Sequence, residues 1–220
     1  CCLVLLLGLW TTNSIAQIGS YTFANTTDAY STIVGGPGTV AVTLSSMDDA
    51  ISATQTLPFT FNFGGTTATT FRINSNGWIG FGAPTSGSNY ASISGTTNDV
   101  IAIFSKDLNG TLTTATTYYV QTSGSTPSRI TKIEYVGIKA YSSTGNPATG
   151  NCQIWLYETS NIVELRYGAF TTSSGRTSAT TVQVGLRGAS TAAANVRSIS
   201  NTGSWSTPTI GTSSGSTVAV

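Results

Sequence analysis

The sequence predicts an all-β fold, an antiparallel β-sandwich or jelly-roll-like arrangement of about twelve short strands. Apolar and polar residues alternate with a period of two along almost every segment, and no segment repeats convincingly at the 3.6 spacing of a helix. Turn clusters such as "GGPG", "SNGW" and "SSTGNPATG" separate these segments. With 220 residues the chain is long enough to bury a substantial core. A closed barrel is the alternative architecture.

A first hairpin is expected in "TFRINSNGWIGFG", where Asn76 and Gly77 form the dipeptide typical of a two-residue type I′ turn. Ile79 and Phe81 then return to the core face, and Trp78 points to the other side. The strands expected from the alternation cover residues 20–24, 39–44, 57–63, 70–75, 77–81, 100–106, 116–121, 129–138, 152–158, 162–167, 181–187 and 196–200.

A second hairpin is expected in "NCQIWLYETSNIVELRYGAF". Cys152, Ile154 and Leu156 share one face of its first strand, which makes the cysteine a small buried hydrophobe. Trp155 and Tyr157 share the opposite face. On the second strand the core-facing residues are expected to be Val163, Leu165 and Tyr167.

The composition favours an extracellular, cell-surface setting. Only 8 % of the residues are charged, and Ser and Thr together make up about three residues in ten. The net charge is +1 with no basic cluster, so no nucleic-acid partner is expected. After the N-terminal run, no segment approaches the ~20 apolar residues of a spanning helix, so no membrane insertion is expected either.

Three parts of the chain are predicted. Residues 1–16, with the apolar run "CCLVLLLGLW", are expected to be a signal peptide that lacks its n-region, and Ser14 and Ala16 favour cleavage before Gln17. A buried N-terminal strand or helix is the alternative. The sandwich is assigned to residues 17–200. Residues 201–220 are rich in turn residues and are expected to be a linker or the start of a following module.

Catalysis is not expected. The chain has no histidine, which excludes Ser-His-Asp and Cys-His arrangements and histidine-containing zinc sites. A β-sandwich glycosidase would have to use two carboxylates, for which Glu134 and Glu164 are the candidates. Glu134 lies on the same strand face as Lys132, and Glu164 on the same face as Arg166, so both are expected to be paired surface ions.

No cofactor is expected, and metal binding is considered at one loop. "KDLNG" offers Asp107 and Asn109 as oxygen donors before a glycine, but the further acidic ligands of a calcium loop do not follow. Asx residues in such positions form turns by bonding their own backbone, which is the favoured interpretation. A structural calcium held with backbone carbonyls is the alternative.

Ligand binding through aromatic side chains is the remaining candidate for a site. Trp155, Tyr157 and Trp78 lie opposite the expected core residues of their strands, where flat rings could hold sugar rings. Apolar residues on both faces of a strand also indicate burial on both faces. The three side chains are therefore either a ligand platform or a second layer of core.

A family resemblance extends over about residues 20–200. The segments "LPFTFNFGGTTATTFRINSNGWIGFG", "DVIAIFSKDLNG", "CQIWLYETSNIVELRYGAF" and "VQVGLRG" resemble a β-sandwich module of large secreted Bacteroidota surface proteins. Such proteins commonly carry fibronectin-type repeats and a type IX sorting domain. The arrangement is also similar to nidogen-type extracellular domains. The resemblance implies adhesive, matrix or polysaccharide-associated roles and supplies no catalytic residues.

The expected function is a non-catalytic structural or adhesion module of a secreted or cell-surface protein. Its expected partners are polysaccharide or other surface and matrix proteins. The first alternative is a carbohydrate-binding module that uses the aromatic strand face. The second is the glycosidase based on Glu134 and Glu164.

Overall fold

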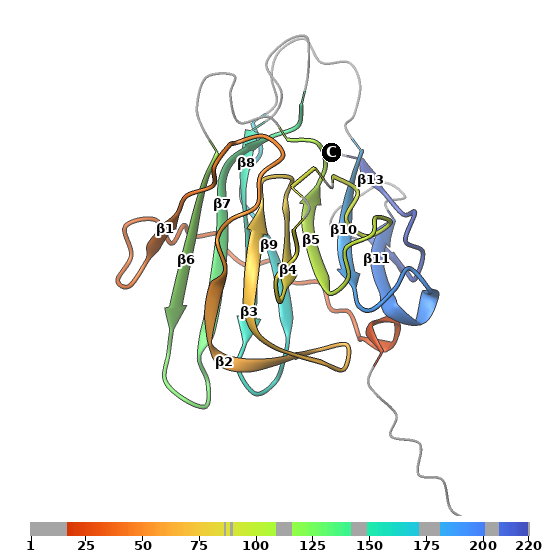
Figure 1. Cartoon of the computed structure of the whole chain (residues 1–220), viewed down its shortest axis with the longest axis horizontal. Helices are drawn as coiled ribbons and strands as arrows, with labels where there is room; N and C mark the ends of the chain where they lie inside the picture. The colour runs from red at the N-terminus through yellow and green to blue at the C-terminus, as the bar shows by residue number, and fades with distance from the viewer. Residues whose placement is uncertain are drawn as a thin grey trace, which may run out of the picture.

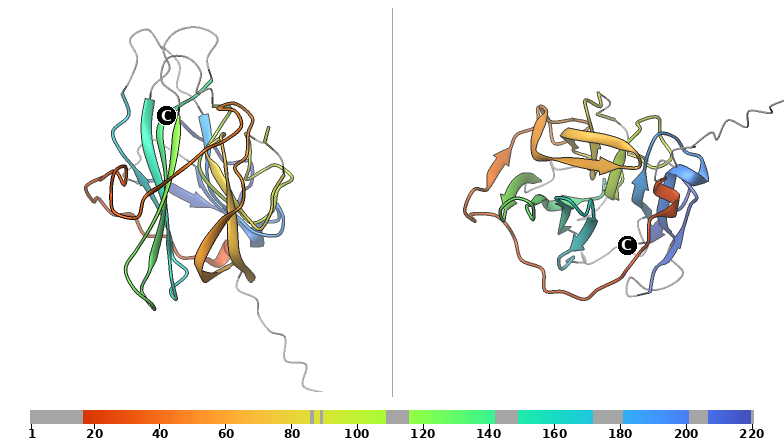
Figure 2. Two further views of the ribbon diagram at one scale, coloured as in Figure 1. Left: turned by 60° about the vertical axis from the view of Figure 1, so that its left-hand side comes forward. Right: turned by 90° about the horizontal axis from the view of Figure 1, so that it is seen from below.

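The computed structural model describes residues 17–85, 87–88, 90–108, 116–141, 149–171, 181–200 and 207–219. In this part the chain forms two antiparallel sheets that pack face to face (Figures 1 and 2). The helical elements described there, η1 (Ile18–Ser20) and η2 (Ala193–Asn195), are single 3-10 turns. The predicted all-β sandwich is confirmed.

The smaller sheet has five strands in the order β1-β6-β7-β8-β9. Its strands β6 to β9 follow one another along the chain as a meander, and β1 joins the β6 edge. The bounds are β1 (Val40–Val42), β6 (Thr117–Ser123), β7 (Ile130–Lys139), β8 (Thr149–Tyr157) and β9 (Val163–Tyr167).

The larger sheet has the order β12-β11-β10-β5-β4-β3-β2, with β13 also paired to β10. The hairpin β3–β4 lies inside this sheet between β2 and β5. The bounds are β2 (Gln55–Phe63), β3 (Thr66–Asn74), β4 (Trp78–Phe81), β5 (Val100–Ser105), β10 (Thr181–Arg187), β11 (Val196–Ser200), β12 (Thr209–Gly211) and β13 (Val218–Ala219).

The main core lies between the sheets and follows the period-two pattern of the sequence. On β2 every second residue is buried, and the buried residues include Phe61 and Phe63. On β8 Cys152, Ile154 and Leu156 are fully buried, as predicted. Burying one such side chain stabilises the fold by about 1.5–3 kcal/mol, so this face is what holds the two sheets together.

The β3–β4 connection is a hairpin, as predicted, but not of the expected turn type. Asn74 pairs with Trp78, which leaves three residues in the connection instead of two. Gly77 has φ +77°, whereas Asn76 is not among the described non-glycine residues with positive φ. A three-residue hairpin needs one left-handed position, and Gly77 supplies it. The type I′ prediction was therefore wrong.

The ends of the sandwich also differ from the sequence-based boundaries. Residues 20–24 form no strand; the buried Ile18 in η1 packs beside Gly64 and Gly188 instead. Residues 209–211 and 218–219 form β12 and β13, which pair with β11 and β10. The segment 201–220, predicted to be a linker or the start of a following module, therefore contributes strands to the larger sheet. All strands that the structure describes lie within residues 17–219, and the expected signal peptide lies outside the described residues.

An ion pair closes the end of the β7–β8 ladder. The Arg129 side chain donates from Nη2 to Glu158 Oε1 at 2.6 Å and from Nε to Oε2 at 2.9 Å. The Arg129 backbone N–H also donates to Glu158 Oε2 at 3.0 Å. These hydrogen bonds lower the pKa of Glu158 from 4.5 to about 2. The carboxylate form of Glu158 therefore stabilises the folded chain.

This lowered pKa predicts a stability difference that depends on pH. A carboxyl group whose pKa is lowered by folding contributes stability above its unfolded pKa and loses it as the pH falls through its folded pKa. We expect Glu158→Gln to be less stable than the wild type by a constant margin above about pH 5.5. The margin should shrink between pH 4.5 and about 2. Urea unfolding of both proteins at several pH values measures it, and a margin that grows toward acid pH would contradict the assignment.

Candidate functional site

The outer face of the five-stranded sheet carries most of the residues that the sequence singles out. On this face Trp155 of β8 lies opposite Lys132 of β7 and opposite Glu164 of β9. Gln153, two residues before Trp155, lies opposite Glu134 and Arg166. Register alone therefore brings two of the three aromatic candidates, Trp155 and Tyr157, and both candidate carboxylates onto one face.

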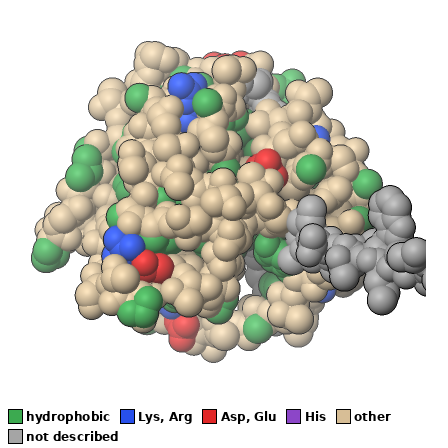
Figure 3. Space-filling model, turned by 60° about the horizontal axis from the view of Figure 1, so that its bottom comes forward, with side chains coloured by type: hydrophobic (Ala, Val, Ile, Leu, Met, Phe, Trp, Pro, Cys, Tyr) green, Lys and Arg blue, Asp and Glu red, His purple; other side chains and the backbone are tan. Residues whose placement is uncertain are grey.

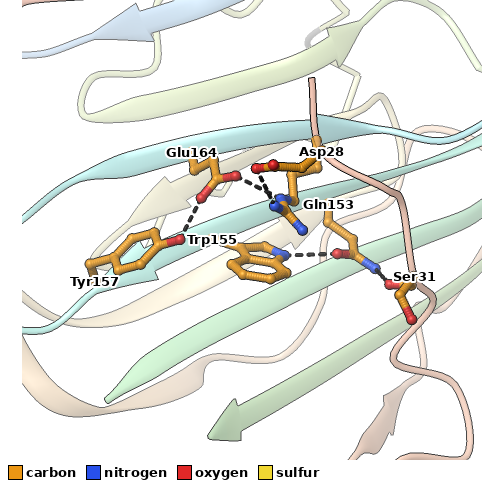
Figure 4. Close-up of polar contacts among 7 residues, drawn as sticks. Asp28, Ser31, Gln153, Trp155, Tyr157 and Glu164 are labelled. Carbon is orange, nitrogen blue, oxygen red and sulfur yellow. Dashed lines mark hydrogen bonds and ion pairs between the residues drawn. The ribbon is translucent and has the colours of Figure 1, made fainter. Parts of the chain in front are cut away.

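Trp155 is half-buried, and cations lie over its ring. Lys132 Nζ is 4.2 Å from the ring centroid, and Arg166 Cζ is 4.1 Å from it. Both distances are well within the range of a cation–π interaction. The indole Nε1 donates a hydrogen bond of 2.7 Å to Gln153 Oε1 (Figure 4). The ring therefore already has partners from the chain itself, both at its π system and at its N–H group.

Tyr157 is half-buried beside Trp155 but is not coplanar with it. The two ring centroids are 6.4 Å apart and the rings are tilted by 41°. The Tyr157 hydroxyl donates to Glu164 Oε2 (Figure 4). Burial and this hydrogen bond raise the pKa of Tyr157 to about 12. The pair thus does not form one flat surface on which successive sugar rings could stack.

Glu164 belongs to a chain of ion pairs, as the sequence predicts. Arg166 Nε donates to Glu164 Oε1 at 2.6 Å, and Arg166 Nη2 lies 3.0 Å from Asp28 Oδ2. Asp28 is mostly exposed and comes from a segment far away in the sequence. The pairing of Glu164 with Arg166 is confirmed, and it also anchors the N-terminal part of the chain to β9.

Glu134 is fully buried, which corrects the prediction of a surface ion pair with Lys132. Its Oε1 accepts a 2.7 Å hydrogen bond from the Tyr30 hydroxyl. Its Oε2 accepts from Thr32 Oγ1 at 3.0 Å and from the Ile33 N–H at 2.8 Å. Burial and the bond to Glu134 raise the pKa of Tyr30 far above its usual value. The two oxygens face protein donors rather than solvent.

The cover over Glu134 is a segment that we call the N-terminal strap, residues 28–39. Figure 2 shows this part of the chain running past the outer side of the five-stranded sheet before it enters β1. Gln153 Nε2 donates to the Ser31 carbonyl at 2.9 Å (Figure 4). Gln121 Nε2 donates to the Pro37 carbonyl and to Thr39 Oγ1, both at 3.0 Å. The strap is therefore fixed to the sheet largely by polar contacts with the buried side chains of Gln121, Glu134 and Gln153.

Trp78 lies elsewhere and is fully buried. Its side chain belongs to a small second core on the outer side of the larger sheet, with Ile93, Val100 and Val196. The Trp78 carbonyl accepts a 2.7 Å hydrogen bond from the Tyr135 hydroxyl. Trp78 therefore cannot take part in an exposed ligand platform, and the second-layer interpretation holds for this residue.

The described part of the loop considered for metal binding pairs with a segment distant in the sequence. The Asp107 carbonyl accepts from the Tyr141 N–H at 2.8 Å. Burial, followed by the nearby Asp48 and Asp49, raises the pKa of Asp107. Asn109 lies outside the described residues. Within the described ranges, no group of three or more His, Cys, Asp or Glu side chains is placed to hold a metal ion.

Two packed antiparallel sheets, a covered outer face and paired carboxylates define a β-sandwich module. The chain matches the NIDO-related family over residues 20–219 and belongs to that family. The predicted similarity to nidogen-type domains is thereby confirmed, and such domains are typically extracellular. Comparison with curated proteins and with solved structures gave no significant match. In the part of the chain that is described, no helix has the length and apolar character needed to span a bilayer.

Proposed function

We propose that this chain is a non-catalytic module of an extracellular structural or adhesive assembly, in contact with other surface or matrix proteins. The observation that carries the proposal is that side chains of the chain itself already occupy the aromatic face of the five-stranded sheet. Trp155, the best candidate for sugar stacking, has Lys132 and Arg166 over its ring at 4.2 and 4.1 Å. A sugar would have to displace these cations before it could stack.

The carboxylates support a role without turnover. A glycosidase needs a proton donor that reaches the substrate and a second carboxylate beside it. Glu134 is fully buried and accepts hydrogen bonds from three groups of the strap. Glu164 is engaged by Arg166 and Tyr157. Both carboxylates therefore already have hydrogen-bond partners within the chain where a glycosidase would need them to face a glycan.

Surface chemistry and family membership support the extracellular setting. The face drawn in Figure 3 is mostly covered by uncharged polar side chains and backbone, with few acidic or basic groups. Membership of the NIDO-related family points to the same compartment. Attachment to a larger Bacteroidota-type surface protein remains a prediction from the sequence resemblance.

Polysaccharide binding by residues 17–220 tests the proposal. The wild type is titrated against a panel of neutral and acidic polysaccharides, with and without calcium. The same titration is made with a Trp155→Ala, Tyr157→Ala double variant. A Tyr90→Ala, Tyr141→Ala double variant is the matched control, since both tyrosines are about half exposed elsewhere on the molecule. Thermal unfolding establishes that each variant is folded.

We expect no saturable binding by any of the three proteins. Saturable binding that is lost in the Trp155, Tyr157 variant and kept in the control would contradict the proposal and make the chain a carbohydrate-binding module. Binding that appears only with calcium would support the alternative of a structural calcium near Asp107. Hydrolysis of any polysaccharide in the panel would contradict the non-catalytic role directly.

A further inference from the structure

At the ends of the two strand orders, the described part of the sandwich has four edge strands: β1 and β9 in the smaller sheet, and β2 and β12 in the larger; the two-residue β13 pairs with the end of β10 beside this order. An edge strand presents backbone N–H and C=O groups that have no ladder partner, so it can pair with another chain. Natural sheets commonly protect such edges with charges, prolines or covering segments. The four edges of this molecule differ in that protection.

Three of the edges carry recognisable protection. β9 holds the charged pair Glu164 and Arg166. β2 contains Pro58, and the Asn62 N–H at its end donates a 2.7 Å hydrogen bond to Asn161 Oδ1 from the opposite sheet. β12 begins directly after Pro208.

Apart from its length of three residues, the β1 edge lacks such protection. Residues 29–47, which include β1 and the turns on either side, contain no charged residue. Val40 is 61 % exposed, the highest value among the exposed large hydrophobic residues of the described chain. Val40 is in step with Val42 and Leu44 in the period-two pattern and so points to the same face, and both of those residues are buried in the core. Val40 thus sits at the rim of the core, where a further strand would cover it. Figure 1 shows β1 at the outer edge of the sheet, beside β6.

We propose that β1 is a self-association edge, at which a second copy of this chain adds its own β1 antiparallel about a two-fold axis. With Ala41 opposite Ala41 of the other copy, Val40 of each chain faces Val42 of the other. The five-stranded sheets then become continuous across the pair. This inference deepens the proposed function, on which it rests, by naming the partner of the adhesive module.

Charge favours a second copy over a different protein. An isologous interface places each residue near its own counterpart, so a charged edge would face its own charge. An edge without any charge from 29 to 47 avoids that repulsion. Paired β-branched side chains are also favourable cross-strand neighbours. Because β1 has only three residues, the dimer is weak, and repeated copies on a surface strengthen it through effective concentration.

Sedimentation velocity of residues 17–220 over a range from micromolar to millimolar concentration tests the edge. We expect a reversible monomer–dimer equilibrium that Val40→Lys weakens at least about tenfold, since lysine on an edge opposes strand addition. Ile162→Lys is the matched control, because Ile162 is 54 % exposed and lies in the β8–β9 turn. This control adds the same charge and should leave the equilibrium unchanged. Both variants should unfold at the wild-type temperature.

Cross-linking tests the register without weakening the edge. Ala41→Cys should form a disulfide-linked dimer under mild oxidation, because the two-fold pairing places the two new thiols directly opposite each other. Ile162→Cys should remain monomeric. Cys152, the cysteine native to residues 17–220, is buried and should not react.

Three results would overturn the inference. The wild type could stay monomeric at millimolar concentration, the dimer could survive Val40→Lys unchanged, or association could run on into open-ended polymers. A monomeric wild type removes only the self-pairing. The non-catalytic role then stands or falls with the polysaccharide titration. A monomer that instead binds an extended peptide at β1 would assign the edge to a different partner.

Discussion

Replacing Glu134 by alanine should lower the free energy of unfolding by about 3–5 kcal/mol, the range for breaking a buried charged network. The loss arises because the Tyr30 hydroxyl, the Thr32 hydroxyl and the Ile33 N–H all donate to this one carboxylate. Glu134 is fully buried, so water cannot replace it without opening the strap. Urea unfolding measures the loss, and the midpoint of thermal unfolding should fall by about 10 °C.

Two further variants test whether the loss of stability comes from the buried carboxylate of Glu134. Glu134→Gln keeps the shape and one acceptor oxygen, so it should lose clearly less stability than alanine. Glu164→Ala is the matched control on strand β9 of the same sheet, where the carboxylate is only half-buried and its ion pairs are close to solvent. Partly exposed ion pairs contribute about 0–1 kcal/mol. Equal losses for Glu134→Ala and Glu164→Ala would contradict the conclusion that the buried Glu134 carboxylate holds the strap on the sheet.

Hydrogen exchange shows where the Glu134 variant opens. The Ile33 N–H is held by Glu134 in the wild type and should exchange slowly. In Glu134→Ala we expect this amide to exchange far faster, while the amides of β7 and β8 change only as much as the global stability does. Unchanged protection at Ile33 would mean that the strap is held by its contacts to Gln153 and Gln121 alone.

The sequence predicts the strands well because one-sided burial leaves a local trace. In β8 the core residues Cys152, Ile154 and Leu156 alternate with partly buried or polar-bonded side chains, and the structure places them as predicted. The same alternation predicts an exposed Glu134. That expectation fails because the cover over Glu134 comes from residues 101 to 104 positions earlier in the chain. No local pattern can reveal such a cover.

Two other differences have equally physical reasons. The alternation of Trp78 with the core residue Ile79 leaves open whether Trp78 faces a ligand or a second layer of core. Segments distant in sequence bury the outer side of β4 and so decide for the core. Residues 201–220 are dominated by Ser, Thr and Gly, which predicts a linker or the start of a following module. Strands as short as β12 and β13 are fixed by pairing with β11 and β10 rather than by their own alternation.

Gly77→Ala should destabilise the sandwich by about 3 kcal/mol or more, through backbone strain and overpacking together. Gly77 has φ +77°, and a Cβ atom there would lie 2.2 Å from the carbonyl oxygen of Phe104. The Gly77 carbonyl also accepts from the N–H groups of Ile103 and Phe104, at 3.1 and 3.0 Å. Neither backbone can move away without breaking these bonds, so the clash falls on the centre of the larger sheet.

Gly82→Ala separates the two causes. Gly82 has φ +71°, but a Cβ atom there would meet nothing within 4 Å. Its alanine variant should therefore show the left-handed strain alone, about 1–2 kcal/mol. The difference in urea unfolding between the two variants measures the contact with Phe104. If the two losses were equal, the glycine of "SNGW" would serve only the turn. A larger loss at Gly77 means that it also lets the β3–β4 connection pack directly against the backbone of β5.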